Sequence, residues 1–225
     1  MIDLHTHTFL SDGVLIPSEL VRRAYVSGYK AIALTDHVDY SNIETVLSAL
    51  IRVSVELNKF WEIVVLPGVE ITHVPVEVFS DIVKYARDNG AKIIVGHGES
   101  PVEPVIPGTN TAAIKAGVDI LAHPGYISED AARLAGEKGV FLEITARKGH
   151  SKTNAHVFER AVKAGAHMVL NTDAHAPDDL LTVEKREEIL SGLTDAAIIK
   201  GEILRNSEKI VEKILSNTES RNHGR

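Results

Sequence analysis

The strongest constraint on the fold of this 225-residue chain is a pattern that its sequence repeats. A helical segment ends at a glycine, a short apolar run follows, and the run ends at a residue that can bind a metal ion. Glycine is expected where a helix ends in a left-handed turn. Continuous apolar runs of this length are typical of strands buried on both faces of a parallel sheet. The repeats run from Gly28 to Asp36-His37, from Gly90 to His97, from Gly117 to His123 and from Gly165 to Asp173.

Three further apolar runs begin at Ile2, Ile63 and Val140, and the second of them leads to Glu70. Together the runs predict seven parallel strands, each followed by a helical segment. This alternation indicates an α/β fold, a distorted (β/α)7 TIM-like barrel. An open doubly wound sheet is the alternative, but in such a sheet only the strand ends near the switch point meet over one site. Because metal-binding residue types end nearly every strand here, we predict the barrel, with a metal site at the C-terminal ends of its strands.

Length and composition limit the class of protein. We expect a single barrel domain over residues 1–216 and a disordered polar tail over residues 217–225. The formal charge is −7 and the basic residues are scattered, which argues against a surface for duplex nucleic acid. The absence of cysteine excludes thiolate metal sites and cysteine nucleophiles. Because the sequence has neither a signal-like segment nor an apolar run of membrane length, we expect a cytoplasmic protein without membrane contact.

Two further segments receive specific predictions. The longest irregular stretch, Glu99 to Gly108, contains three prolines, and we interpret it as an active-site loop. The last helix is expected over Ile210 to Leu215, after a cap at Asn206 or Ser207.

The strand ends carry only nitrogen and oxygen ligands. Residues two apart on a strand point to the same face, so His5 and His7 present two imidazoles side by side. Six of the eleven histidines lie at equivalent strand ends, which chance does not explain. Nine ligands are too many for one ion and suit two or three divalent ions, Zn²⁺, Mn²⁺ or Fe²⁺, that share bridging carboxylates. The expected ligands are His5, His7, Asp12, His37, Glu70, His97, His123, Asp173 and His175.

These residues lie in motifs that resemble the PHP (polymerase and histidinol phosphatase) superfamily, along essentially the whole chain and with no family ligand missing. The motifs are His5-Thr6-His7-Thr8, Ser11-Asp12-Gly13, Thr35-Asp36-His37, Pro67-Gly68-Val69-Glu70, His97, Ala122-His123-Pro124 and Asp173-Ala174-His175. The resemblance implies a histidinol-phosphatase-like, single-domain member with a distorted barrel and a trinuclear metal site. By this resemblance, the three ions are bound by His5, His7, Glu70 and Asp173; by Glu70, His97 and His123; and by Asp12, His37 and His175.

We therefore predict a metal-dependent phosphatase that hydrolyses a small phosphomonoester by metal-activated hydroxide. Glu70 and Asp173 are expected to be catalytic because they hold the ions, and His150 is a candidate proton donor to the leaving alkoxide. The loop after the sixth strand precedes a helix N-terminus, so Arg147 and Lys148 are the expected phosphate-binding residues. Glu99 is expected to contact a polar group of the substrate. Asp36 is expected to orient a ligand rather than to bind metal.

The sequence leaves several alternatives open. Histidinol phosphate, a sugar phosphate and a nucleotide all fit the expected partner, a small phosphorylated metabolite. A phosphodiesterase or exonuclease that acts on nucleotides or oligonucleotide ends is the main alternative function. A non-catalytic metal-binding module is disfavoured because the ligand set is intact. Hydrolysis of an amide or lactone is disfavoured because no lysine ends a strand. The oligomeric state is not readable from the sequence.

Overall fold

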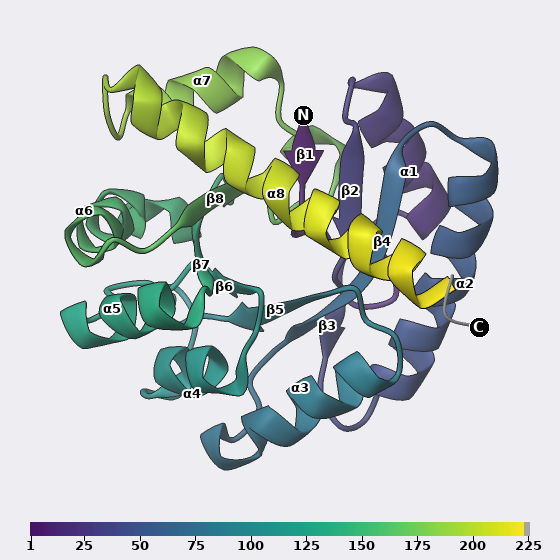
Figure 1. Cartoon of the computed structure of the whole chain (residues 1–225), viewed down its shortest axis with the longest axis horizontal. Helices are drawn as coiled ribbons and strands as arrows, with labels where there is room; N and C mark the ends of the chain where they lie inside the picture. Colours follow the sequence, from purple (N-terminus) through teal and green to yellow (C-terminus); the bar gives the residue numbers. More distant parts are fainter. Residues whose placement is uncertain (223–225) are drawn as a thin grey trace.

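Seven parallel strands form a nearly closed barrel in the computed structural model of the chain, which describes residues 1–222 (Figure 1). Their order around the barrel is β1-β2-β4-β5-β6-β7-β8, and the short strand β3 pairs with β4 beside this path. The predicted TIM-like barrel is therefore confirmed. The strands are β1 Ile2–Asp3, β2 Ala31–Leu34, β3 His37–Val38, β4 Val64–Ile71, β5 Ile93–His97, β6 Ile120–Ala122, β7 Phe141–Thr145 and β8 Met168–Asn171.

A seam between the first and last strands closes the barrel. Just beyond β1 and β8, Thr6 and Ala174 form an isolated parallel bridge. The His7 amide donates to the Ala174 carbonyl at 2.8 Å, and the Asp173 amide donates to the His5 carbonyl at 3.0 Å. These bonds place two pairs of expected ligands next to each other, although the pairs come from opposite ends of the chain.

Helices surround the barrel and largely follow the predicted segments. The glycines that were expected to end helices do so: Gly117 follows α4 with φ 81°, and Gly165 follows α6 with φ 66°. The helices are α1 Pro17–Val26, α2 Ile43–Phe60, α3 Phe79–Asp88, α4 Thr109–Ala116, α5 Glu129–Lys138, α6 Asn154–Ala164, α7 Val183–Ser191 and α8 Ala197–Asn222. Short 3₁₀ turns occur at Val76–Val78 (η1), His150–Thr153 (η2) and Pro177–Asp179 (η3).

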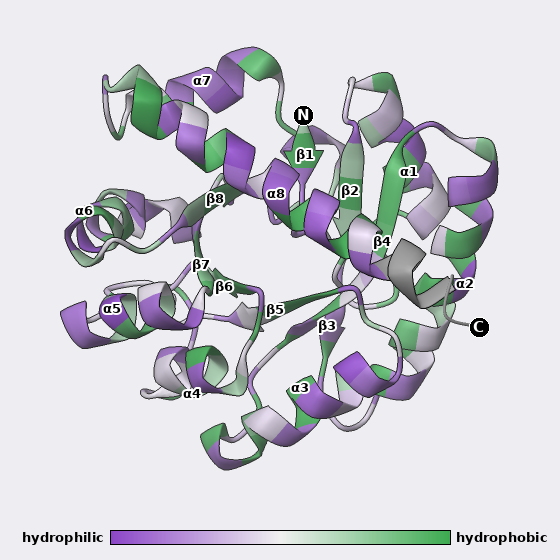
Figure 2. Ribbon diagram, in the orientation of Figure 1, coloured by the Kyte–Doolittle hydropathy of each residue, from purple (hydrophilic) through white to green (hydrophobic). Residues whose placement is uncertain are grey.

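The hydrophobic core has two layers. The larger layer lies between the strands and the surrounding helices, and the smaller one fills the barrel with residues such as Leu4, Leu66 and Val95. Figure 2 shows β4 and β5 mostly as hydrophobic residues, whereas the helices alternate between hydrophobic and hydrophilic ones. Ile210 and Val211 of α8 join the inner layer, because α8 crosses the N-terminal end of the barrel and covers it (Figure 1).

The last helix differs from the prediction. Helix α8 begins at Ala197 rather than near Ile210, and Asn206 lies inside it instead of capping it. The buried Asn206 side chain donates from Nδ2 to the Met168 carbonyl at 2.9 Å, so it ties α8 to β8. In the expected tail, residues 217–222 continue α8, and residues 223–225 lie outside the described residues. No helix within residues 1–222 is long and apolar enough to cross a membrane.

Candidate metal centre

The nine expected ligands come together at the mouth formed by the C-terminal ends of the strands. His5 and His7 follow β1, are fully buried, and have their Nε2 atoms 3.0 Å apart. His5 Nε2 lies 3.3 Å from Glu70 Oε1, and His7 Nε2 lies 3.2 Å from Asp173 Oδ1. The adjacent imidazoles that the strand spacing predicts are therefore present, and each faces a carboxylate from another strand.

The ligand atoms form overlapping groups in which every atom lies within 4.8 Å of the others. One group is the predicted set of Glu70, His97 and His123, and another joins His5 and His7 to Glu70. Asp173 joins His5 and His123 in a further group. The overlap through Glu70 gives this carboxylate the place that a bridging ligand would occupy.

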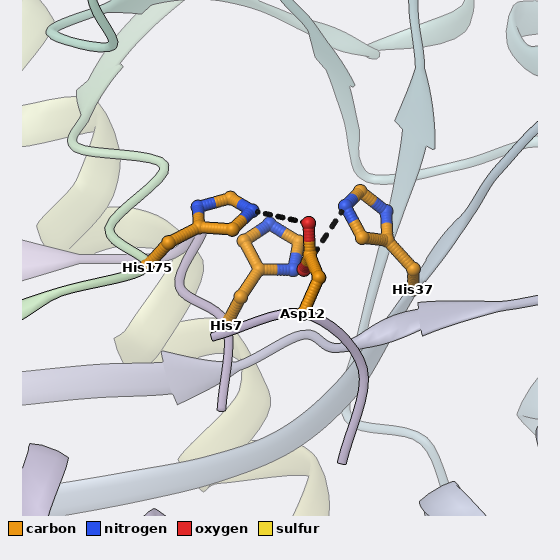
Figure 3. Close-up of side chains that lie close together, drawn as sticks. All are labelled: His7, Asp12, His37 and His175. Atoms are coloured by element: carbon orange, nitrogen blue, oxygen red, sulfur yellow. Dashed lines mark ion pairs between the residues drawn. The ribbon is translucent and has the colours of Figure 1, made fainter. Parts of the chain in front are cut away.

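Asp12 organises the most open group, which Figure 3 shows as His7, Asp12, His37 and His175. Its carboxylate lies between two imidazoles, with Oδ2 3.1 Å from His175 Nε2 and Oδ1 3.6 Å from His37 Nε2. Thr8 and Ser11 fix the loop that carries Asp12, because both donate to the Asp36 carboxylate at 2.8 Å, Thr8 from its amide and Ser11 from its hydroxyl. Asp36 thus orients the loop that carries Asp12.

The chemistry of Glu70 tests whether the site fits metal ions. Its side chain is fully buried, and although His37 Nδ1 lies 2.7 Å from Oε2, neither carboxylate oxygen forms a well-aligned hydrogen bond with the described residues. Burial would raise the pKa of Glu70, but His5, His37 and His97 hold it well below its usual range. A buried, ionised carboxylate is costly unless a cation compensates it. The nitrogen and oxygen donors around Glu70 therefore fit divalent cations.

Two of the histidines, His7 and His123, have the protonation state that metal binding requires. Burial lowers the pKa of His7, and neighbouring His37 and His5 lower it further. Burial lowers the pKa of His123 as well, with His97 adding to the effect. Within residues 1–217, the Nδ1 atoms of His7 and His123 have no hydrogen-bond partner. Both rings are thus held neutral, and neutral imidazole is the form that binds metal.

Glu143 is a carboxylate at the site that the sequence analysis missed. It is fully buried on β7, and its Oε2 lies 2.9 Å from His5 Nδ1. The same oxygen accepts from Asn171 Nδ2 at 2.9 Å, and Oε1 accepts from the His123 amide at 3.3 Å. A carboxylate on the outer nitrogen of a metal-binding histidine fixes its orientation and tautomer. The available signal was a charged residue inside an otherwise apolar strand.

Burial lowers the pKa of His5, but the carboxylates of Glu143, Glu70 and Asp173 outweigh this and raise it well above its usual value. Burial, together with Glu70 and Glu143, raises the pKa of Asp173 to about 6. In the metal-free chain these groups therefore share protons, which bound cations would displace.

Glu103 is the second residue that was missed, and it comes from the predicted active-site loop. Its Oε2 lies 3.0 Å from His97 Nε2 and 3.3 Å from His73 Nε2, and its Oε1 lies 3.3 Å from His150 Nε2. Hydrogen bonds from His150 and His97 lower the pKa of Glu103 far below its usual value. The prediction that this loop lies at the site is consistent with these contacts, but nothing in the local sequence distinguished Glu103.

The expected proton donor and substrate cations lie on the loop after β7. His150 is buried beside His123, with 4.3 Å between ring centroids, and its Nδ1 lies 2.7 Å from Ser100 Oγ. Arg147 is half-buried, and its Nη1 donates to Asp179 Oδ2 at 3.1 Å. That oxygen also accepts the His175 amide at 2.9 Å, so Arg147 is tied to a ligand-bearing loop.

Lys148 and Glu99 have different surroundings. Lys148 lines an open hollow together with Arg147 and Lys152. The Glu99 Oε1 atom accepts from the backbone amides of Gly108 at 3.0 Å and of Asn110 at 2.8 Å. These bonds close the base of the loop and give the backbone amides at the start of α4 a hydrogen-bond acceptor. The contacts of Glu99 therefore show this role.

Comparisons with known proteins lead to the family whose motifs the sequence resembles. The PHP domain family matches residues 3–98. An uncharacterized protein of Methanocaldococcus jannaschii is 44% identical over 94% of this chain and 99% of its own length. A protein named probable phosphatase, from Thermoanaerobacter sp., is 25% identical, with 95% of each chain covered. The Bacillus subtilis protein named DNA polymerase/3'-5' exonuclease PolX is 27% identical over 86% of this chain, which spans 36% of that protein.

A solved structure of similar fold comes from Listeria monocytogenes, and its name proposes that it is a histidinol phosphatase. It aligns with a TM-score of 0.57 at 10% identity and covers 82% of this chain and 99% of that one. At this identity the likeness shows the fold alone, and that fold is a TIM-like barrel with its strand ends at one mouth.

Proposed function

Because the chain belongs to the PHP domain family of metal-dependent phosphoesterases, we propose that it hydrolyses a small phosphomonoester. The observation that carries this proposal is the buried Glu70 carboxylate, which forms no well-aligned hydrogen bond with the described residues and lies at the centre of converging imidazoles and carboxylates. Bound divalent ions would lower the pKa of water and neutralise charge on the phosphoryl group. The relative named probable phosphatase supports the choice of a monoester.

The proposed site holds two or three ions of Zn²⁺, Mn²⁺ or Fe²⁺, since all the donors are nitrogen or oxygen. Glu70 would be shared between ions, since it belongs to two of the groups, and Asp173 belongs to the deepest group, beside His5 and His7. Asp12 serves the most open group, near solvent, with 55% of its side chain exposed. The remaining proposed ligands are His37, His97, His123 and His175.

The protein residues proposed to act on the substrate lie around these ligands. Arg147 keeps donors free for a phosphate oxygen, because its guanidinium has five N–H groups and Asp179 takes one of them. Lys148 adds a positive charge beside it. His150 is the proposed proton donor to the leaving oxygen, because it is a buried histidine beside His123 that lies outside the ligand set.

A phosphodiesterase or exonuclease is the second candidate. The observation that favours it is the match to the Bacillus subtilis protein named as a polymerase and 3'-5' exonuclease. The end of a nucleic-acid strand would enter the same mouth of the barrel. Arg147, Lys148 and Lys152 would then contact its phosphates.

The test compares the two substrate classes on one preparation. The protein, loaded separately with Mn²⁺, Zn²⁺ or Fe²⁺, is assayed for phosphate release from an aryl phosphate monoester and from a panel of sugar phosphates, nucleotides and histidinol phosphate. An aryl diester and a short labelled oligonucleotide are assayed in parallel. We expect turnover of monoesters and its loss in EDTA. Turnover of only the diester or the oligonucleotide would replace the monoesterase proposal by the second candidate. Tight metal binding without any turnover would instead favour a binding module.

A further inference from the structure

We propose that Glu103 is a tenth metal-binding residue, which supplies a carboxylate to the ion bound by Glu70, His97 and His123. This inference rests on the metal binding of the proposed function. Glu103 lies outside the nine ligands that the family motifs identify, and it reaches the site from the loop between β5 and α4.

His97 turns its Nε2 atom toward Glu103. Its Nδ1 lies 3.1 Å from the carbonyl oxygen of Gly98, so the ring proton at Nδ1 is donated to that carbonyl. Nε2 is therefore the nitrogen left for the site, and it lies 3.0 Å from Glu103 Oε2. Without metal, Nε2 donates a hydrogen bond to this carboxylate. A metal ion that replaced the proton would have both atoms as neighbouring ligands.

The proposed ion sites differ in their supply of negative charge. Of the three ion sites expected from the family motifs, one has Asp173 besides Glu70, and another has Asp12. Among those nine ligands, the set of Glu70, His97 and His123 has no carboxylate of its own and shares Glu70 with its neighbour. Divalent ions such as Mn²⁺ and Fe²⁺ favour carboxylate oxygen, so this site gains most from a further carboxylate. Glu103 lies outside the nine ligands, and its carboxylate forms an ion pair with His97.

Two histidines hold the Glu103 carboxylate in place. His73 Nε2 lies 3.3 Å from Oε2, and His150 Nε2 lies 3.3 Å from Oε1. If His150 donates from Nε2, its Nδ1 accepts the Ser100 hydroxyl at 2.7 Å, and both ring nitrogens have a partner. Contacts of this kind orient metal-binding carboxylates and strengthen binding.

The base of the loop is also fixed. A Cβ atom at Gly98 would lie 2.1 Å from the Ala122 carbonyl oxygen, so this close approach to the β6 loop requires glycine. On the other side of the loop, the Glu99 amide donates to Asn110 Oδ1 at 2.9 Å. The loop therefore delivers Glu103 from a rigid base.

The test measures equilibrium metal binding, without substrate, in the full-length protein. Wild type, Glu103→Gln and Glu103→Asp are titrated with Mn²⁺ or Zn²⁺ against a chelating indicator, and bound metal is counted by mass spectrometry. Glu129→Gln is the matched control, because it removes the same charge from a half-exposed glutamate that pairs with Lys163 on the surface. We expect Glu103→Gln to weaken one equivalent of metal by about tenfold or more. Glu103→Asp should lose less, and the control should bind as wild type does.

Cobalt binding separates a ligand from a residue that acts only through His97. Each protein is loaded with Co²⁺, whose visible absorption changes position and intensity when a directly bound atom changes. Glu103→Gln should alter one cobalt component, and the control should not. Metal affinity and a cobalt spectrum identical to those of wild type would overturn the inference while leaving the proposed function intact. If wild type itself binds no metal, the proposed function fails. Circular dichroism verifies that each variant is folded. If Glu103→Gln does not fold, Glu103→Asp replaces it in the test. An unchanged metal affinity and cobalt spectrum in Glu103→Asp would then overturn the inference.

Discussion

Replacing Glu143 by glutamine tests how far the buried carboxylate, rather than the ligands themselves, determines metal affinity. The substitution keeps the shape of the side chain but removes its charge, and its amide group would face a donor at His5 Nδ1 across 2.9 Å. A hydrogen bond that involves a charged group contributes about 1.5–3 kcal/mol. Since about 1.4 kcal/mol corresponds to tenfold in affinity, we expect metal binding to weaken by about one to two orders of magnitude. This range agrees with the usual effect of removing a residue that orients a metal-binding histidine.

The assay is competition with a chelator of known affinity, performed on wild type, Glu143→Gln and the surface variant Glu137→Gln. Glu137 lies on α5 with 64% of its side chain exposed, so its change in charge should leave metal affinity unaltered. Thermal unfolding of the metal-free proteins shows whether the fold survives. If metal-free Glu143→Gln is folded and binds metal as tightly as wild type, the reasoning about His5 orientation is refuted.

Four further predictions concern the site and the fold. Arg147→Ala should raise KM for a phosphomonoester by about tenfold or more, without change in bound metal, as measured by steady-state kinetics and metal analysis. Removing metal with EDTA should lower the midpoint of thermal unfolding, because metal present at a thousand times its Kd stabilises the fold by about 4 kcal/mol. Asn206→Ala should lower the free energy of unfolding by about 1–3 kcal/mol in urea, since it leaves the Met168 carbonyl unpaired, and should not alter metal affinity. Burial raises the pKa of Asp3 from 3.8 to about 6, so the folded chain binds more protons than the unfolded chain in this range. The free energy of unfolding of metal-free wild type, relative to Asp3→Asn, should therefore fall as pH rises from about 4 to about 6.

The convergence of the nine proposed ligands was predictable from the geometry of a barrel. Each of them lies at or after the end of an apolar strand, and parallel strands in a barrel all end at one mouth. His97 and His123 could thus be placed near each other without any knowledge of their contacts. The same rule predicted the barrel rather than an open sheet.

Glu143, Glu103 and Asn206 escaped prediction because their roles depend on contacts between distant parts of the chain. Glu143 meets His5 across 138 residues, and Asn206 meets Met168 across 38. Apolar periodicity identifies the buried face of an element, but it does not identify the atom that a polar side chain will meet there. Asn206 is a common residue type at a helix start, so local preference favoured a cap, and packing of α8 against β8 decided otherwise.

The seam between β1 and β8 sets the order in which the site can be assembled. Leu4 and Asn171, whose hydrogen bond lies beside the seam, are 167 residues apart, and contacts over such separations form late in folding. During synthesis His5 and His7 emerge first, and Asp173 and His175 emerge only after all eight strands have been made. The growing chain therefore carries an incomplete and weak set of ligands for most of its synthesis. An ion held by His5, His7 and Asp173 would bind only at the final stage of folding, when the two ends of the chain meet, and it would then link one end to the other.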